Sequence, residues 1–230
     1  MRSHTPFFEL QAGLAEPGCP ICRLTVRALE RFFAAVVYER VNDRSLRDAI
    51  RRAYGFCTNH GPMVRAARSA LGVAIIQRDV LRAAATALDP EALGRGPIRS
   101  LIAQLGGPRS SDGPLKPGGS CVGCALADEQ CAHWIGILAQ HYPALRSDFQ
   151  ASSGLCLGHV RVALATAPAA IRPMLGADQR TIWARLEADL DEFIRKHDHQ
   201  FAAEPMGAES DSWARATDLL SGDARAFGRR

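Results

Sequence analysis

The chain has 230 residues, of which 47% are hydrophobic and 23% are charged, and its formal net charge is +4. A chain of this length can bury a hydrophobic core without help from disulfides or metal ions, and its composition is that of a soluble globular protein. The sequence has no apolar run of about 18 residues and no secretory leader, which predicts a cytoplasmic protein without a membrane span. In a reducing cytosol, paired cysteines indicate metal ligands or redox centres before disulfides.

Apolar residues at three- and four-residue spacing predict helices in the first part of the chain, beginning with one over 23–38. Asn42, Asp43 or Ser45 can cap a second helix, which Gly55 can end. Further helices are expected over 60–71, 73–88 and 98–105. No segment alternates polar and apolar residues as a half-buried strand would.

The second part of the chain follows a segment, 106–120, that is rich in Gly, Pro and Ser and is therefore predicted to be a linker. A helix of about 17 residues is expected after Cys124, and Pro143 is expected to open a short helix that ends at Gly154. Three more helices are predicted over 160–166, 178–196 and 213–220. The fold class is therefore all-α, with an N-terminal half at 1–105 and a C-terminal half at 121–230.

A pattern of cysteine and histidine occurs twice in the sequence. Each half carries a C-x-x-C pair that is followed more than 30 residues later by a C-x-x-H pair, and the eight residues are Cys19, Cys22, Cys57, His60, Cys121, Cys124, Cys156 and His159. Three thiolates and one imidazole in this two-plus-two spacing can surround one tetrahedral ion. We therefore predict one Cys3His metal site in each half. Buried free thiols would explain one cysteine but not the repeated spacing.

Other positions match between the halves when they are counted from the C-x-x-H pair. Leu145 and Arg146 correspond to Leu46 and Arg47, and a glycine lies two residues before the cysteine in both halves. These matches predict two pseudo-repeated helical halves that arose by internal duplication. Each half would be held together by its own metal site.

Zinc is the expected metal, with two ions in the chain, because zinc accepts thiolate and imidazole in a tetrahedron. Four protein ligands leave no position for a catalytic water, so the sites are expected to be structural. An iron–sulfur cluster is the alternative, since cysteine and histidine can also hold one.

The remaining candidate residues have less specific patterns. Cys131, one turn into a predicted helix, is expected to be a packed core cysteine, and Glu129 with His133 is a weak candidate for a carboxylate-bridged metal site. The polar segment 197–211 contains acid and base side chains that could serve an enzyme. Four arginines could share one helical face and bind phosphate or nucleic acid, but interleaved acidic residues favour a solvated face with ion pairs; these are Arg40, Arg44, Arg47 and Arg51.

The motifs GCPIC, GFCTNH, CVGC and GLCLGH, together with the segment EPMGAESDSW, resemble an uncharacterised bacterial family of unknown function. The resemblance implies a bacterial cytosolic protein with paired metal sites, and it implies no activity. The residues and the resemblance together predict a zinc-stabilised binding or regulatory module, whose partner is expected to be a protein, with no catalytic residues assigned. A redox or sensor protein with iron–sulfur or oxidisable zinc–thiolate sites is the alternative, and an enzyme that uses 197–211 is a third possibility.

Overall fold

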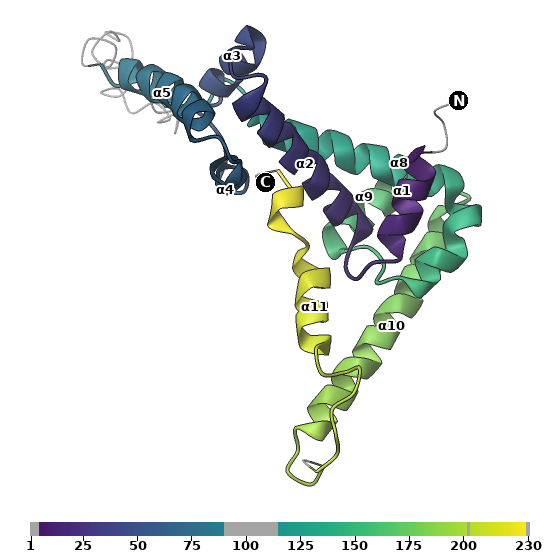
Figure 1. The fold of residues 1–230 in the computed structure, drawn as a ribbon. Coiled ribbons are helices and arrows are strands. Elements are labelled where there is room, and N and C mark those ends of the chain that lie inside the picture. The colour runs from purple at the N-terminus through teal and green to yellow at the C-terminus, as the bar shows by residue number, and fades with distance from the viewer. Residues whose placement is uncertain (1–4, 90–114, 202, 229–230) are drawn as a thin grey trace, which may run out of the picture. The chain divides into compact units, whose positions relative to one another are not determined.

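A computed structural model describes residues 5–89, 115–201 and 203–228 of the chain. The described residues form α-helices and one short 3₁₀ helix, without a strand, so the all-α prediction is confirmed (Figure 1). The predicted helix at 98–105 and most of the predicted linker lie outside the described residues. The elements are α1 Thr5–Leu14, α2 Pro20–Tyr38, α3 Arg44–Arg52, α4 Gly61–Ala66, α5 Ala70–Ala87, α8 Val122–Ala151, α9 Leu157–Thr166, α10 Arg172–Lys196, α11 Ser212–Ser221 and η1 Ala224–Ala226.

The chain forms two compact units, which do not coincide with the halves 1–105 and 121–230. Unit 1 contains Met1–Ala28 and Ala127–Phe227, and unit 2 contains Leu29–Leu126 and Gly228–Arg230. Both α2 and α8 pass from one unit into the other, so each unit is built from segments of both halves.

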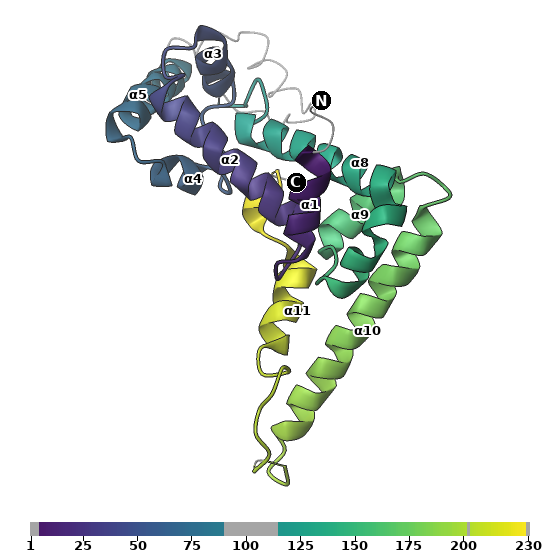
Figure 2. The ribbon, with the colours of Figure 1, turned by 45° about the vertical axis from the view of Figure 1, so that its right-hand side comes forward.

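In unit 1, α9, α10 and α11 contact one another around a core that includes most of α8 (Figure 2). The core side chains Tyr142, Leu145 and Phe149 of α8 are fully buried. Asp178 of α10 is also buried, and it accepts hydrogen bonds from Tyr142 Oη at 2.9 Å and from Arg146 Nε at 2.7 Å. Because these donors satisfy the carboxylate, α10 can be held against α8 without an unpaired buried charge.

The expected break at Pro143 is wrong, because α8 continues through this proline for 30 residues. Proline removes one backbone hydrogen bond from a helix interior and normally kinks it. Here the side chains on both sides of Pro143, Tyr142 and Leu145, are fully buried. Packing against α10 therefore outweighs the local cost of proline.

In unit 2, α5 contacts both α3 and α4. Asp43 caps α3, as its sequence position predicted, by accepting a hydrogen bond from Leu46 N at 3.1 Å. Arg47 of α3 donates to Asp79 of α5 at 3.0 Å. Gly72 of α5 lies against the backbone of Val37, where an added Cβ would fall 1.7 Å from the carbonyl oxygen. Only glycine allows α5 to approach α2 this closely.

Candidate metal centres

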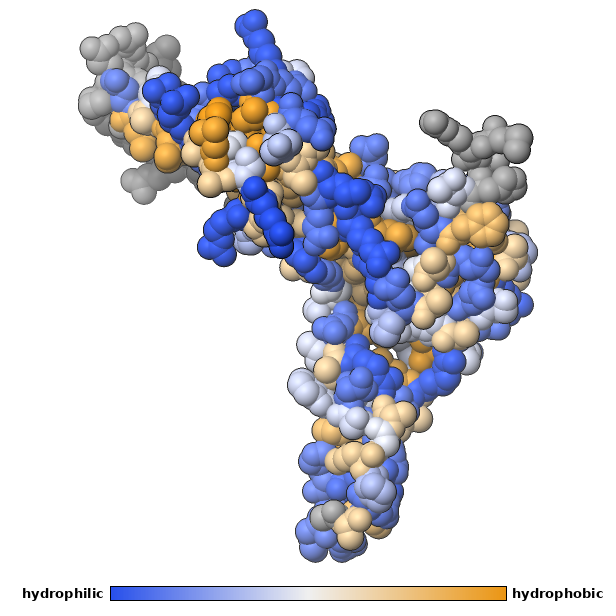
Figure 3. All heavy atoms as spheres, in the orientation of Figure 1, coloured by the Kyte–Doolittle hydropathy of each residue, from blue (hydrophilic) through white to orange (hydrophobic). Residues whose placement is uncertain are grey.

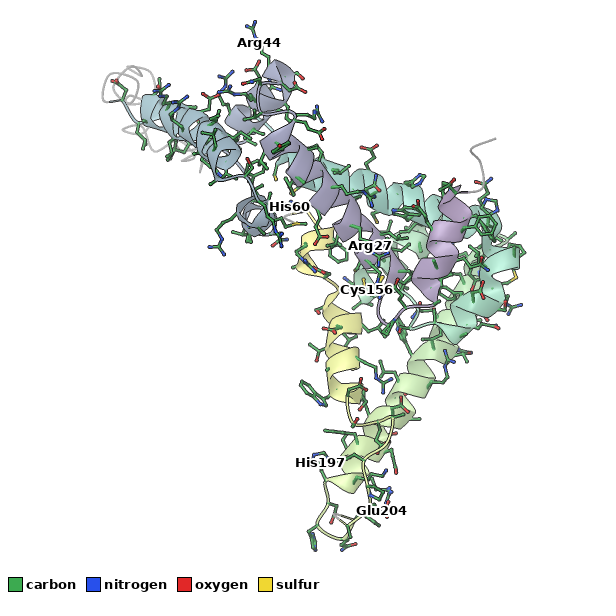
Figure 4. The ribbon with its side chains drawn as sticks, viewed as in Figure 1. Arg27, Arg44, His60, Cys156, His197 and Glu204 are labelled. Atoms are coloured by element: carbon green, nitrogen blue, oxygen red, sulfur yellow. The ribbon has the colours of Figure 1, made fainter. Side chains whose placement is uncertain are left out.

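The eight predicted ligands form two clusters, and within each cluster the four ligand atoms lie within 4.8 Å of one another. We call them site 1, with Cys19, Cys22, Cys156 and His159, and site 2, with Cys57, His60, Cys121 and Cys124. Site 1 lies in unit 1 and site 2 lies in unit 2. Figure 4 labels one residue of each cluster, Cys156 and His60.

The predicted pairing of the motifs is wrong, because each C-x-x-C meets the C-x-x-H of the other half. The reason is the length of the helices between the motifs. Cys124 lies in the first turn of α8, whereas Cys156 follows the far end of this helix. A single helix of 30 residues thus lies between the two motifs of the C-terminal half, and these motifs fall in different units. The 19-residue helix α2 likewise lies between Cys22 and Cys57, which also fall in different units.

The geometry of both clusters fits a single tetrahedral ion. Zinc with bonds of about 2.3 Å to sulfur and about 2.0 Å to nitrogen would place two sulfurs about 3.8 Å apart and a sulfur and a nitrogen about 3.5 Å apart. In site 1 the Cys22 and Cys156 sulfurs are 3.6 Å apart, and Cys22 Sγ lies 3.4 Å from His159 Nδ1. In site 2, Cys124 Sγ lies 3.6 Å from both Cys57 Sγ and His60 Nδ1.

Local backbone structure aims these side chains at one point. Each C-x-x-C stands at the start of a helix, α2 or α8, where the helix dipole stabilises thiolates. Before each C-x-x-H, a glycine with positive φ turns the chain, at +98° for Gly55 and +72° for Gly154. A residue with a Cβ would be strained at either position.

The ligand groups of site 1 shift one another's pKa values. Burial lowers the pKa of His159, but the neighbouring thiols of Cys131 and Cys156 outweigh this effect and raise the pKa to about 11. Against the effect of burial, hydrogen bonds with Cys156 and Cys22 hold the pKa of Cys19 well below its usual range, whereas hydrogen bonds with Cys156 and Cys19 raise the pKa of Cys22. A proton on His159 and a metal ion compete for the same Nδ1 atom, so acid should weaken metal binding.

The C-terminal segment 222–227 covers site 1. The backbone N–H of Asp223 donates to Cys22 Sγ at 3.5 Å, and the Phe227 ring stacks on His159 with 4.6 Å between the ring centroids. Gly158 and Gly222 leave room for this segment, because a Cβ at either position would fall within 3 Å of the Phe227 ring. Sequence reasoning missed Phe227 and Asp223, which have no motif of their own.

Site 2 is closed by residues near its own ligands. The Phe33 ring lies 5.9 Å from the His60 ring. Gly123, between the two cysteines of CVGC, touches the same histidine so closely that a Cβ would fall 2.7 Å from His60 Cγ. Glycine is therefore required at this position of the second C-x-x-C, whereas Ile21 occupies the corresponding position of the first.

Among the described residues, Glu129 and His133 belong to neither cluster. Cys131, predicted to be a core cysteine, is half-buried and acts on His159, whose Nε2 is buried without a hydrogen bond of normal geometry. A histidine that binds metal through one nitrogen commonly donates the other N–H to a neighbour, and Cys131 is the residue placed to receive it.

The polar segment 197–211 is occupied by ion pairs and caps. Lys196 pairs with Glu209 at 2.7 Å, and Glu209 also accepts from Gly207 N at 2.7 Å. His197 bonds to the Phe193 carbonyl at 2.8 Å. Figure 4 shows His197 and Glu204 at the C-terminal end of α10. The cavities beside Cys19, near Asp148 and between α10 and α11 take no lining residue from this segment.

The arginines of the predicted cationic face are also largely paired. Arg40 pairs with Asp43 at 2.7 Å, and Arg51 pairs with Asp79 at 3.5 Å. Arg47 pairs with the same Asp79 at 2.5 Å. These carboxylates offset the positive charge that a phosphate would otherwise meet.

The family assignment follows from the matched residues. The family of unknown function DUF6062 matches residues 10–226. The chain belongs to this family. It is also similar to the uncharacterised 23.9 kDa protein in the xynA 3′ region of Caldicellulosiruptor sp. (strain Rt8B.4), with 43% identity over 64 residues, which is 28% of this chain and 31% of that protein. No solved structure matches the chain. Within the described residues, no helix is long and apolar enough to cross a membrane.

Proposed function

We propose that this family member is a cytoplasmic zinc protein in which two structural ions hold a binding module together. The observation that supports zinc most directly is the donor set, because each cluster offers three sulfurs and one nitrogen around a space for one ion. Four protein ligands complete a tetrahedral zinc shell and leave no open position, which favours a structural over a catalytic ion.

The positions of the ligands support a binding module in unit 1. Cys19 ends the loop that contains Pro17 and Gly18, and Cys156 ends the loop that contains Ser152 and Ser153. Gly18 N donates to Ser153 Oγ at 3.0 Å, so these two loops touch each other beside the cluster. An ion in site 1 would therefore hold both loops in place, although Gly18 and Ser153 do not bind the ion themselves.

Metal analysis with absorption spectroscopy on anaerobically purified protein tests the proposal. We expect two equivalents of zinc and no visible absorption band. Iron in the protein together with a brown colour would indicate an iron–sulfur cluster in place of zinc. A protein that lacks both metals and keeps its full stability in the presence of a chelator would contradict any structural role for metal.

A redox sensor is the second candidate, and a cavity of about 370 Å³ beside Cys19 and Cys22 favours it. Through this cavity hydrogen peroxide could oxidise two zinc thiolates to a disulfide, with water as the reduced product and zinc as the released ion. Stoichiometric zinc release at low peroxide, reversed by a thiol reductant, would support the sensor. Zinc that stays bound until the protein unfolds would exclude it.

A further inference from the structure

We propose that unit 1 binds a small zwitterion with an apolar body, such as an apolar amino acid or a dipeptide, between α10 and α11. The ligand's negative group would meet Arg185 and its positive group would meet Asp218. This inference rests on the proposed structural role of the metal, because site 1 anchors the walls of the cavity.

The cavity has a volume of about 420 Å³ and is lined by residues of α10, α11 and two loops. Its apolar wall includes Ile182, Leu186 and Leu219, of which Ile182 and Leu219 are buried. Figure 3 shows a hollow between α10 and α11 with hydrophobic residues at its edge. A cavity of this volume, with an apolar wall and a few polar groups, is typical of small-molecule sites.

Arg185 of α10 supplies a positive charge to the cavity. Its Nη2 atom donates to the carbonyl oxygens of Gln150 at 2.5 Å and Ser152 at 3.4 Å. No carboxylate pairs with this arginine within the part of the chain that the structure describes. By contrast, the neighbouring Arg215 is neutralised by Asp189 at 3.0 Å and Asp211 at 2.7 Å. Arg185 is therefore held in place with its charge uncompensated, and its other N–H groups can bind an anion.

Asp218 supplies the opposite charge from α11. Its carboxylate makes no ion pair or hydrogen bond with any described residue. It also borders the smaller cavity beside Cys19, but the arginines there have their own carboxylates. Arg23 and Arg27 both pair with Glu16, at 3.2 and 3.3 Å. Arg225 pairs with Asp223 at 2.7 Å. Asp218 thus remains available to an ammonium group.

The two charges enter the cavity from different elements. Arg185 stands on α10 and is tied to the loop at Ser152, whereas Asp218 stands on α11 and also borders the cavity beside Cys19. The apolar wall lies in the same cavity. A ligand that carries an anion, a cation and an apolar body would satisfy all three surfaces, and a ligand that lacks either charge would leave one of the two charged side chains unpaired.

Site 1 fixes three parts of the cavity wall. The loop with Pro17 and Gly18 leads directly into Cys19, and the loop with Ser152 leads to Cys156. Helix α11 is followed by Asp223, whose N–H binds Cys22 Sγ. The metal would therefore shape the cavity without touching the ligand.

Calorimetric titration of the zinc-loaded full chain with leucine and with leucyl-leucine tests the proposal. We expect binding of at least one probe. N-acetylation of that probe, which removes the cation, should weaken binding about tenfold or more, and so should amidation, which removes the anion. The substitution Arg185→Gln should abolish the difference between the acid and the amide. The substitution Asp218→Asn should abolish the difference between the free and the acetylated amine.

Arg180→Gln and Asp191→Asn are the matched controls, because both side chains are exposed on α10 and do not line the cavity. Both should bind the probe as the unchanged protein does. The inference would be overturned if neither probe binds at about 10 mM. It would also be overturned if Arg185→Gln and Asp218→Asn bind the acid, amide, free and acetylated probes as the unchanged protein does. Zinc content is measured on every variant. A protein that retains two equivalents of zinc but binds no probe would contradict only the proposed ligand site. A protein that binds the probe without zinc would contradict only the proposed structural role of the metal.

Discussion

The crossed pairing of the motifs predicts which cysteine substitutions remove the same metal ion. Cys22 and Cys156 belong to site 1, so the double substitution Cys22→Ala with Cys156→Ala should leave one bound ion. Cys22 and Cys57 belong to different sites, so Cys22→Ala with Cys57→Ala should leave none. If each half held its own ion, these two results would be reversed.

The stability change for site 1 can be worked out from the loop that it closes. Cys22 and Cys156 are 134 residues apart. A cross-link that closes a loop of this length removes about 5 kcal/mol of chain entropy from the unfolded state at 25 °C. A domain of ordinary stability unfolds with about 5–15 kcal/mol, so the loss of this ion should lower the urea midpoint strongly.

Titration with cobalt(II), followed by its visible bands, counts the sites in each variant. His199→Ala is the control, because the His199 side chain is exposed and lies outside both clusters, and it should keep two equivalents. Each cluster lies inside one compact unit, so the remaining ion should still bind when the other site is removed. One equivalent in Cys22→Ala with Cys57→Ala, and none in Cys22→Ala with Cys156→Ala, would refute the crossed pairing.

Three further predictions concern single residues. Gly123→Ala should remove the ion of site 2 alone, because the new Cβ would fall 2.7 Å from His60 Cγ. Metal analysis should then find one remaining zinc equivalent. Phe227→Ala should speed zinc transfer from site 1 to a chromophoric chelator about 10- to 100-fold, as loss of a contact behind a metal ligand does, and an unchanged rate would contradict the role of the stacked ring. Hydrogen bonding to Arg146 lowers the pKa of Asp178 to about 2, against the effect of burial. This shift contributes about 2 kcal/mol of stability at pH values above the ordinary aspartate pKa of about 4, and the contribution is lost as the pH falls toward 2. Urea unfolding should therefore show Asp178→Asn destabilised at pH 7, with a smaller difference in acid.

The helices and the ligand residues were predictable because their signals are local. The cap at Asp43 and the turn at Gly55 follow from the residue types at these positions. The ligands follow from thiolate and imidazole chemistry at fixed spacing. The pairing was not predictable from spacing, since it depends on how far α2 and α8 run without a break, and the unbroken path through Pro143 depends on tertiary packing.

The positions that brace the metal sites were only partly predictable. Arg146 was matched to Arg47 in the sequence, but its partner Asp178 was not foreseen. The ion pairs Arg47 to Asp79 and Arg146 to Asp178 have the same separation of 32 residues. Gly55 lies against Val80, and Gly154 lies against Gln179, which in each case is the residue after the paired aspartate. Internal duplication stays a prediction, to which these contacts add matched positions beyond the motifs.

These braces act on the C-x-x-H motifs and not on the C-x-x-C motifs. The Gln179 side chain accepts from Leu155 N at 2.9 Å, directly before Cys156, so α10 positions the C-x-x-H of its own half. The C-x-x-C that completes the same cluster arrives at the start of α2, from the other half. Each half therefore positions one C-x-x-H pair for a cluster whose C-x-x-C pair comes from the other half.

Separate expression of the halves 1–105 and 121–230 tests this division. The C-terminal half retains Cys121, Cys124, Cys156 and His159, but these two pairs belong to different clusters, so this half should bind zinc much more weakly than the whole chain. Mixing the halves with zinc should produce a complex with two ions, seen by size-exclusion chromatography with metal analysis. A C-terminal half that binds one zinc ion tightly on its own and keeps its helix content by circular dichroism would show that α8 does not separate the motifs.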